Sequence, residues 1–277
     1  WRHRKINKIC TRVYNYSSTK NWSRNNIKNM ENKTIIKAPK TIPSEMLVEY
    51  LMGGDAYLEY SYLNDCSEEI QNVVNDGFTK DNFDSCVQRI KNKEVNYYGN
   101  TDTWMYEALE KYPVKDKDVC IMGSTYPWYE AMIIEYGAKS CTVIEYSKRE
   151  SFHKKITYLQ PHEITDQKFD MCLSISSYEH DGLGRYGDPL NPNGDIEAMA
   201  NTKNFLNKDG ILYLVVPVGL DKVVFNKHRV YGNVRIKKLL TGWEVLDRFG
   251  FFADSFTNNV NGTGGTPYQP IYILKNI

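Results

Sequence analysis

The sequence predicts an α/β fold in which a doubly wound, mostly parallel sheet is covered by helices on both faces and closes with an antiparallel hairpin. Two observations predict it. From residue 101 onward, short apolar runs alternate with stretches of helical periodicity, a pattern typical of parallel strands joined by helices. Near the end of the chain, two apolar runs flank a glycine-rich turn at 261–265, as expected for a hairpin at a sheet edge.

The 277 residues allow one large domain with an extension, and we divide them into three segments. Residues 1–40 contain eleven of the 35 Lys and Arg residues but one of the 34 Asp and Glu residues. We therefore expect a basic, flexible extension there; the alternative is a basic arm that contacts an acidic partner or a lipid surface. A helical lead-in is expected at 41–100 and the α/β domain at 101–277.

The elements follow from local patterns. Residues 44–88 show helical periodicity, with Ser67 as an N-cap residue. Thr101 and Asp102 begin a helix that runs to residue 112, and Gly137 stands where a helix C-terminal glycine is expected. Strands are predicted at 118–122, 140–146, 156–159, 169–175, 211–218 and 269–274, helices at 129–136, 195–206 and 239–249, and an antiparallel partner of the last strand at 251–256.

Composition excludes several classes of protein. A net charge of +1 gives no reason to expect a nucleic-acid partner, and no run approaches the roughly 18 apolar residues of a membrane span. The six cysteines form no CxxC pair, which excludes zinc ribbons, thioredoxin-like chemistry and a small disulfide scaffold. Cysteines within apolar runs favour a reducing, cytoplasmic setting. The compartment and the oligomeric state stay open.

A nucleoside cofactor site is predicted where the first two strands end. Gly123 follows the first strand, and Glu145 ends the second, 22 residues later. Ligands of such sheets bind outside the carboxyl ends of the strands, where a glycine lets the backbone approach and a carboxylate accepts ribose hydroxyls. Taken singly, the two residues also fit an ordinary turn and an exposed charge. The predicted cofactor-binding residues are Gly123, Ser124, Pro127, Trp128, Glu145 and Ser176.

Reactive side chains gather at 176–195, directly after the strand at 169–175, with four glycines among them. Glu179 or His180 could remove a proton from a substrate hydroxyl, and Arg185 could bind an acidic or sugar-phosphate group. The alternative is a surface loop held together by its own Asp–Arg pairs.

A second polar cluster, at 226–232, follows the next strand. Because loops after neighbouring strands converge, we expect His180 and His228 to face one ligand. No spacing supports a metal held by Glu179, Asp188 and His228, so no metal is predicted. The predicted catalytic residues are Glu179, His180, Arg185 and His228, and the predicted substrate-binding residues are Tyr186, Asp188, Asn226, Arg229 and Tyr231.

Residues 123–147, 176–199 and 216–232 resemble the nematode-type domain-of-unknown-function family two-sixty-eight, and the resemblance covers roughly 95–275. That family looks like a divergent class I S-adenosylmethionine-dependent methyltransferase, with a Rossmann-like sheet of about seven strands and a terminal antiparallel hairpin. The resemblance matches Gly123 to the first glycine of the methyltransferase motif, Glu145 to the acid that holds the ribose, and 176–180 to the acceptor region. Ile121, Thr125 and Pro127 depart from that motif.

The leading hypothesis is therefore S-adenosylmethionine-dependent methyl transfer to a polar small molecule or carbohydrate acceptor. The altered glycine motif leaves two alternatives open. One is a catalytically inactive methyltransferase-like scaffold, and the other is a nicotinamide or nucleotide-sugar enzyme on a similar sheet. Thermal shifts with S-adenosylmethionine, NAD and a nucleotide-sugar separate the three, because a ligand stabilises the protein that binds it.

Overall fold

The structure is a computed structural model that describes residues 37–257 and 268–277. Most of the predicted extension at 1–40 and the predicted glycine-rich turn at 261–265 lie outside these residues. Among the described helices, none is long and apolar enough to cross a membrane.

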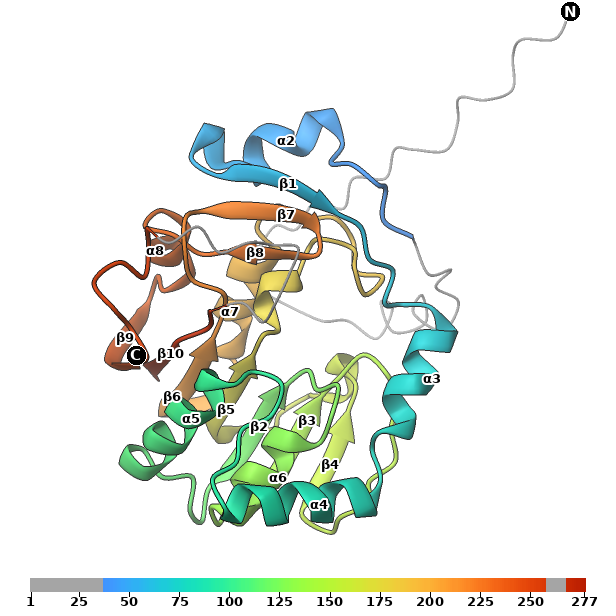
Figure 1. Ribbon diagram of the computed structural model, residues 1–277, viewed down its shortest axis with the longest axis vertical. Coiled ribbons are helices and arrows are strands. Elements are labelled where there is room, and N and C mark those ends of the chain that lie inside the picture. Colours follow the sequence, from blue (N-terminus) through green and yellow to red (C-terminus); the bar gives the residue numbers. More distant parts are fainter. Residues whose placement is uncertain (1–36, 258–267) are drawn as a thin grey trace, which may run out of the picture. The chain divides into compact units, whose positions relative to one another are not determined.

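A seven-stranded sheet forms the centre of the fold (Figure 1). Its order is β4-β3-β2-β5-β6-β10-β9, and every neighbouring pair is parallel except those that involve β10. Within this sheet the chain begins at β2, continues outward through β3 to β4 and then returns to β5 on the other side of β2. The strand order therefore reverses between β2 and β5. The predicted fold class is confirmed. The strands are β2 (Asp118–Met122), β3 (Ser140–Ile144), β4 (Ile156–Leu159), β5 (Phe169–Ile175), β6 (Leu206–Val215), β9 (Trp243–Phe249) and β10 (Ile271–Asn276).

Alternating side chains of the strands build two separate cores. Val119 and Ile121 of β2 pack with helices α4 (Lys80–Lys91), α5 (Asn100–Lys111) and α6 (Trp128–Glu135). Cys120, between them in sequence, packs with α7 (Gly194–Thr202) and α8 (Arg235–Leu239). Side chains of a strand point alternately to opposite faces, and apolar residues on both faces require helices on both sides.

A second, three-stranded sheet has the order β1-β7-β8. Its strands are β1 (Tyr57–Ser61), β7 (Lys222–Asn226) and β8 (His228–Val230). β7 and β8 form a hairpin that follows β6, and β1 pairs with β7 in parallel. Helices α2 (Ser44–Tyr50) and α3 (Glu68–Asp76) and the short helices η1 (Met52–Gly54), η2 (Pro161–Glu163) and η3 (Tyr178–His180) complete the described fold. Tyr50 of α2 packs on Phe225 and Leu183, which joins this sheet to the residues after β5.

The helical prediction for 44–88 is wrong at β1. Glycines at positive φ, Gly53 and Gly54, end the first helical stretch, and Tyr57 then donates its backbone N–H to Asp221 O at 2.9 Å. The partner strand lies far away in sequence, so local periodicity does not reveal the pairing. The Ser67 cap is confirmed, since its hydroxyl accepts from Ile70 N.

The closing elements also differ from the prediction. The helix predicted at 239–249 is wrong, because α8 ends at Leu239, Gly242 has φ +79 and Trp243–Phe249 is the edge strand β9. Apolar residues three and four apart in that stretch mimic helical spacing. The hairpin therefore joins β9 to β10, not 251–256 to 269–274, and β10 lies inside the sheet. β6 begins at Leu206, earlier than predicted, and the predicted loop at 226–232 includes strand β8.

Candidate functional site

Three of the residues predicted to bind a cofactor, Gly123, Ser124 and Glu145, lie close together beside the point where the strand order reverses. Gly123, directly after β2, has φ +70, and a Cβ added there would lie 3.2 Å from Ser177 Oγ. Ser124 donates its backbone N–H to Glu145 Oε2 at 3.0 Å. The Glu145 carboxylate therefore lies against the turn that follows β2. Its other oxygen accepts from Tyr146 N at 2.7 Å.

Arg149, which sequence reasoning missed, fixes this turn. Its guanidinium donates to Ser124 O at 2.7 Å and to Asn75 Oδ1 at 2.7 Å, and it lies 3.9 Å from Glu145 Oε2. It also stacks over the Phe78 ring, 3.9 Å from the ring centre. The only sequence signal is the four-residue spacing from Glu145. Arg149 thereby connects the turn after β2, the Glu145 carboxylate and helix α3.

The start of α6 contributes less to an open site than the sequence suggested. Pro127 is the residue before the helix, and Trp128 is buried with its indole N–H donating to Asp102 Oδ1 at 3.1 Å. Glu130, in the first turn of the helix, is completely buried, and neither carboxylate oxygen has a hydrogen-bond partner among the described residues. Burial raises the pKa of Glu130 to about 7.

A chain of polar side chains runs from the end of β5 toward β10. Ser176, at φ +50, donates to Glu179 Oε1 at 2.5 Å and accepts from Gln269 Nε2 at 3.2 Å. Glu179 is completely buried, and burial raises its pKa to about 7 despite the bond from Ser176. No sequence pattern pointed to Gln269, because it reaches Ser176 only through the tertiary fold. Tyr98 lies beside Ser176 and Glu179, and burial raises its pKa to about 12.

The tautomer of His180 is assigned from its nearest partner. Its Nδ1 lies 2.7 Å from Lys227 O and 3.3 Å from Arg185 Nη1. Because the carbonyl oxygen can only accept and is the closer of the two, we assign the proton to Nδ1 and the lone pair to Nε2. Nε2 lies 3.7 Å from Glu179 Oε1. Burial, and then the positive charge of Arg185, hold the pKa of His180 well below its usual range. The imidazole is therefore neutral at neutral pH.

Arg185 and His228 lie around His180. Arg185 donates to Asp65 Oδ2 at 2.6 Å and to Lys227 O at 3.2 Å, so its charge is matched by a residue of the lead-in. The His228 ring centre lies 6.5 Å from that of His180, and burial lowers the pKa of His228 to about 3. The structure thus brings the four predicted catalytic residues together; their roles stay predictions.

The residues predicted to bind substrate differ in their contacts: some lie beside His180, and others bond to the chain's own loops. Tyr186 faces His180 with 5.6 Å between the ring centres. Asp188, in contrast, accepts from the backbone N–H groups of Gly182 and Gly184 at 2.7 and 3.1 Å, and Asn226 pairs with both backbone groups of Leu63. The last two side chains hold the chain's own loops.

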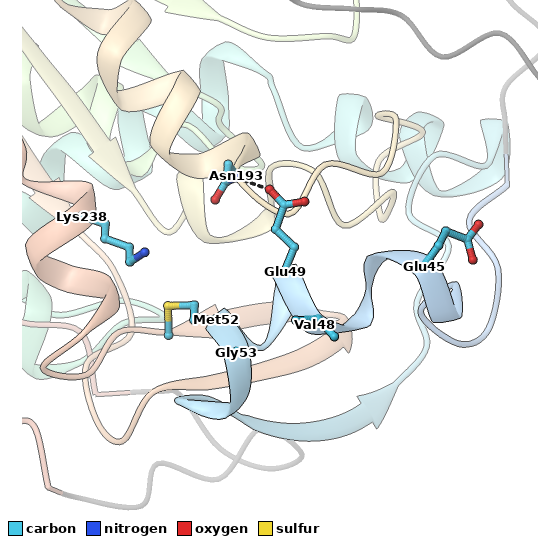
Figure 2. A pocket seen from close by; sticks show the side chains of 7 residues that line it. All are labelled: Glu45, Val48, Glu49, Met52, Gly53, Asn193 and Lys238. Atoms are coloured by element: carbon cyan, nitrogen blue, oxygen red, sulfur yellow. Dashed lines mark hydrogen bonds between the residues drawn. The ribbon is translucent and has the colours of Figure 1, made fainter.

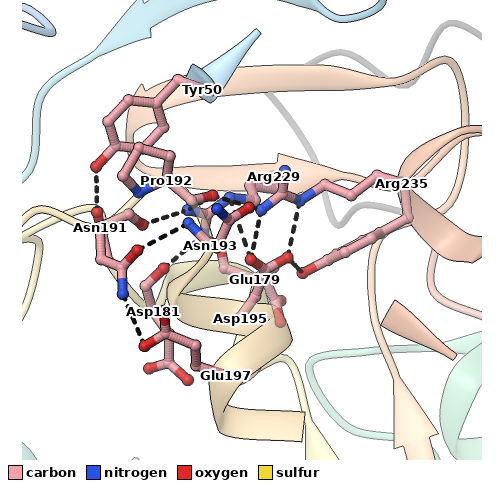
Figure 3. Close-up of polar contacts among 12 residues, drawn as sticks. Tyr50, Glu179, Asp181, Asn191, Pro192, Asn193, Asp195, Glu197, Arg229 and Arg235 are labelled. Atoms are coloured by element: carbon pink, nitrogen blue, oxygen red, sulfur yellow. Dashed lines mark hydrogen bonds and ion pairs between the residues drawn. The ribbon is translucent and has the colours of Figure 1, made fainter. Parts of the chain in front are cut away.

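Arg229 and Tyr231 belong to a buried ionic network around Asp195. Figure 3 shows Asp195 with Arg229 and Arg235. Asp195 accepts from Arg235 at 2.8 and 2.5 Å and from the Tyr231 hydroxyl at 2.9 Å. Arg229 donates to Asp181 O at 2.5 Å and to Asn191 O at 3.2 Å. Burial opposes ionisation of Asp195, but the two arginines hold its pKa below its usual range. The network anchors the loop between β5 and α7 to β8 and α8.

No group of three or more potential metal ligands occurs within the part of the chain that the structure describes. A cavity of about 460 Å³ lies elsewhere, between α2, η1 and the start of α7 (Figure 2). Its lining includes Glu49, which accepts from Asn193 Nδ2 at 2.7 Å, and Lys238. None of the predicted site residues lines it.

Comparison with known protein families gives one match for this chain. The model of the family described as Caenorhabditis protein of unknown function, DUF268, matches residues 116–260. The chain belongs to this family, which is the same family that its sequence resembles. No curated protein gives a significant sequence match.

Several solved structures are similar at low identity. The 1,6-didemethyltoxoflavin-N1-methyltransferase of Burkholderia thailandensis is 12% identical, with 69% of this chain and 88% of that chain covered and a TM-score of 0.44. An S-adenosylmethionine-dependent methyltransferase from Mesorhizobium loti is 10% identical, with 62% and 98% covered and a TM-score of 0.44. A candidate methyltransferase of the same kind from Streptococcus mutans is 10% identical, with 63% and 48% covered and a TM-score of 0.41. This chain spans about half the length of that last protein.

Proposed function

We propose that the protein transfers a methyl group from S-adenosylmethionine to a polar small molecule or carbohydrate. One observation carries the proposal: Glu145 Oε2 accepts from Ser124 N at 3.0 Å, which holds a carboxylate against the glycine turn where the strand order reverses. Open α/β sheets bind ligands at this position. A carboxylate there can accept the two hydroxyl groups of a ribose.

The residues present fit the nucleoside part of S-adenosylmethionine. Each Glu145 oxygen accepts one backbone N–H and keeps capacity for a further donor, since a carboxylate has about four lone-pair sites. At Gly123 a Cβ would lie 3.2 Å from Ser177 Oγ, so the glycine lets the turn after β2 pack closely against the residues that follow β5. Gly123, Ser124 and Glu145 would therefore hold the nucleoside. When bound, S-adenosylmethionine supplies an electrophilic methyl group on a sulfonium.

The acceptor would lie at Glu179 and His180, beside the same turn. Methyl transfer is an in-line displacement, so the protein's part is to align the acceptor and take up its proton. Glu179, with its pKa raised to about 7 by burial, is matched to that task at neutral pH. His180 is the weaker base because burial lowers its pKa. Arg185 and Tyr186 border this position.

Calorimetric binding of S-adenosylmethionine and S-adenosylhomocysteine tests the proposal, with NAD and a nucleotide-sugar as comparison ligands. We expect binding of the first two, and a loss of about tenfold or more in Glu145→Ala, the size of a hydrogen bond to a charged group. Glu145→Gln, which retains an acceptor for Ser124 N, separates ligand binding from folding of the turn. Glu150→Ala removes a nearby exposed carboxylate and serves as the control. Unchanged affinity in both Glu145 variants would refute the assigned site.

A further inference from the structure

Among the residues that the structure describes, two buried hydrogen-bond acceptors beside Ser176 have no donor. Glu179 Oε2 and Gln269 Oε1 are both buried and lack a hydrogen-bond partner within residues 37–257 and 268–277. The other oxygen of Glu179 and the amide nitrogen of Gln269 both bond to Ser176 Oγ, at 2.5 and 3.2 Å. The two unpartnered oxygens therefore belong to side chains held by one hydroxyl.

A third acceptor lies next to them. His180 donates from Nδ1 to Lys227 O, so its Nε2 is an acceptor, and it lies 3.7 Å from Glu179 Oε1. Buried polar groups in folded proteins are nearly always hydrogen-bonded, and an unpaired one costs free energy. Among the described residues, Glu179 Oε2 and Gln269 Oε1 are thus two buried acceptors to which a ligand could donate, and His180 Nε2 is a further acceptor beside Glu179.

The charge balance points in the same direction. Among the described residues, the only ion-pair contact of Glu179 is with His180, whose imidazole is neutral. The nearby guanidinium of Arg185 bonds to Asp65 at 2.6 Å, and that of Arg229 lies 3.8 Å from Asp195 and donates to backbone carbonyls. A buried carboxylate without a cation is costly. A ligand that supplies both N–H donors and a positive charge would complete the cluster.

We propose that Ser176, Glu179 and Gln269, with His180 beside them, form a binding site for a primary ammonium group. A hydroxyl group offers a single donor and no charge, whereas an ammonium group offers three donors and one charge. The raised pKa of Glu179 is the expected property of this carboxyl before a cation binds. Ser176 directly precedes Ser177, which adjoins the Gly123 turn.

The ammonium group has two possible sources. It belongs either to the acceptor substrate, which would then be an amine, or to the amino-acid part of S-adenosylmethionine. Only this assignment of the source rests on the proposed function; the ammonium site itself does not. In the first case, the ammonium group passes one proton to the Glu179 carboxylate, which leaves a neutral amine and a carboxylic acid. In the second, Glu179 binds the ammonium group and no proton moves.

Calorimetry with two matched pairs of probes tests the site. One pair is S-adenosylhomocysteine and 5′-methylthioadenosine, and the other is glucosamine and glucose; in each pair only the first carries an ammonium group. We expect the wild-type protein to prefer the ammonium-bearing member of at least one pair. Glu179→Gln and Gln269→Leu should each weaken that member about tenfold, the size of a charge-assisted hydrogen bond. Its ammonium-free counterpart should keep its affinity.

The controls separate this inference from the proposed function. Glu150→Gln, at an exposed position, should leave every affinity unchanged, and thermal unfolding reports whether each variant is folded. If Glu179→Gln does not fold, Gln269→Leu carries the test. Failure of both adenosine compounds to bind would refute the proposed function, while glucosamine and glucose would still test the ammonium site. The inference is overturned if neither pair shows a preference for its ammonium-bearing member, or if the variants weaken both members equally.

Discussion

The burial of Glu130 predicts that the free energy of unfolding depends on pH, which can be measured without any ligand. Its carboxyl group is completely buried and has no hydrogen-bond partner among the described residues, and burial raises its pKa from 4.5 to about 7. The folded protein therefore holds this proton more tightly than the unfolded chain does. The resulting stabilisation is complete below pH 4.5 and is lost as the pH rises through 7.

The size of the effect follows from the shift. Since one pKa unit corresponds to about 1.4 kcal/mol, the Glu130 proton contributes about 3.5 kcal/mol in total, of which about 2.5 kcal/mol is lost between pH 5 and pH 8. Glu130→Gln removes the titration. The free energy of unfolding of the variant, relative to the wild type, should therefore rise by about 2.5 kcal/mol over this interval.

Urea unfolding at pH 5 and pH 8, followed by circular dichroism, measures this difference. Any constant cost of burying the glutamine amide is the same at both pH values and cancels. Glu150→Gln, which removes an exposed carboxyl, should show no comparable change. A difference for Glu130→Gln below about 1 kcal/mol between the two pH values would contradict the reasoning.

Two further predictions concern Asp195, at the start of α7, and the loop that precedes this helix. Asp195→Asn should lower the free energy of unfolding by about 3–5 kcal/mol in urea titrations, because it leaves the buried Arg235 without its charge partner; a loss below about 1 kcal/mol would show that the network is not needed for stability. Gly182→Ala should destabilise by more than about 2 kcal/mol in the same assay, since φ is +79 and the new Cβ would lie 2.0 Å from Asn191 O. A stability equal to wild type would mean that the loop relaxes freely.

The strands of the central sheet were predictable because each is a short apolar run bounded by turn residues. β2, β4 and β5 have the bounds that the sequence predicted. β1 and β9 could not be predicted in this way. β1 forms a strand because it pairs with β7, and β9 forms a strand because it pairs with β10. Exposed edge strands carry little of the periodic apolar signal on which such predictions depend.

The candidate site divides in a similar way. Gly123 and Glu145 were predictable from their places at the ends of two strands, and the 3.0 Å bond between Ser124 N and Glu145 shows that these strand ends adjoin. Glu179 and His180 were singled out as rare reactive residues after an apolar strand. Arg149 and the ammonium-site residue Gln269 carried no comparable signal. Their functional roles stay predictions until binding is measured.

By itself, the amino-acid sequence determined the alternation of strands and helices, the glycines that end them and the family, because burial on two faces of a sheet leaves a periodic record along the chain. Only the tertiary structure decided which polar side chains meet. In sequence, nothing separates Glu179 and His180 from Asp188, Asn226 and Arg229, because all five are polar residues of the two clusters that follow strands. In the structure, however, the hydrogen bonds of the last three hold the chain's own loops. Whether a buried polar group is satisfied or left to bind a ligand depends on partners from distant segments, which no local pattern encodes.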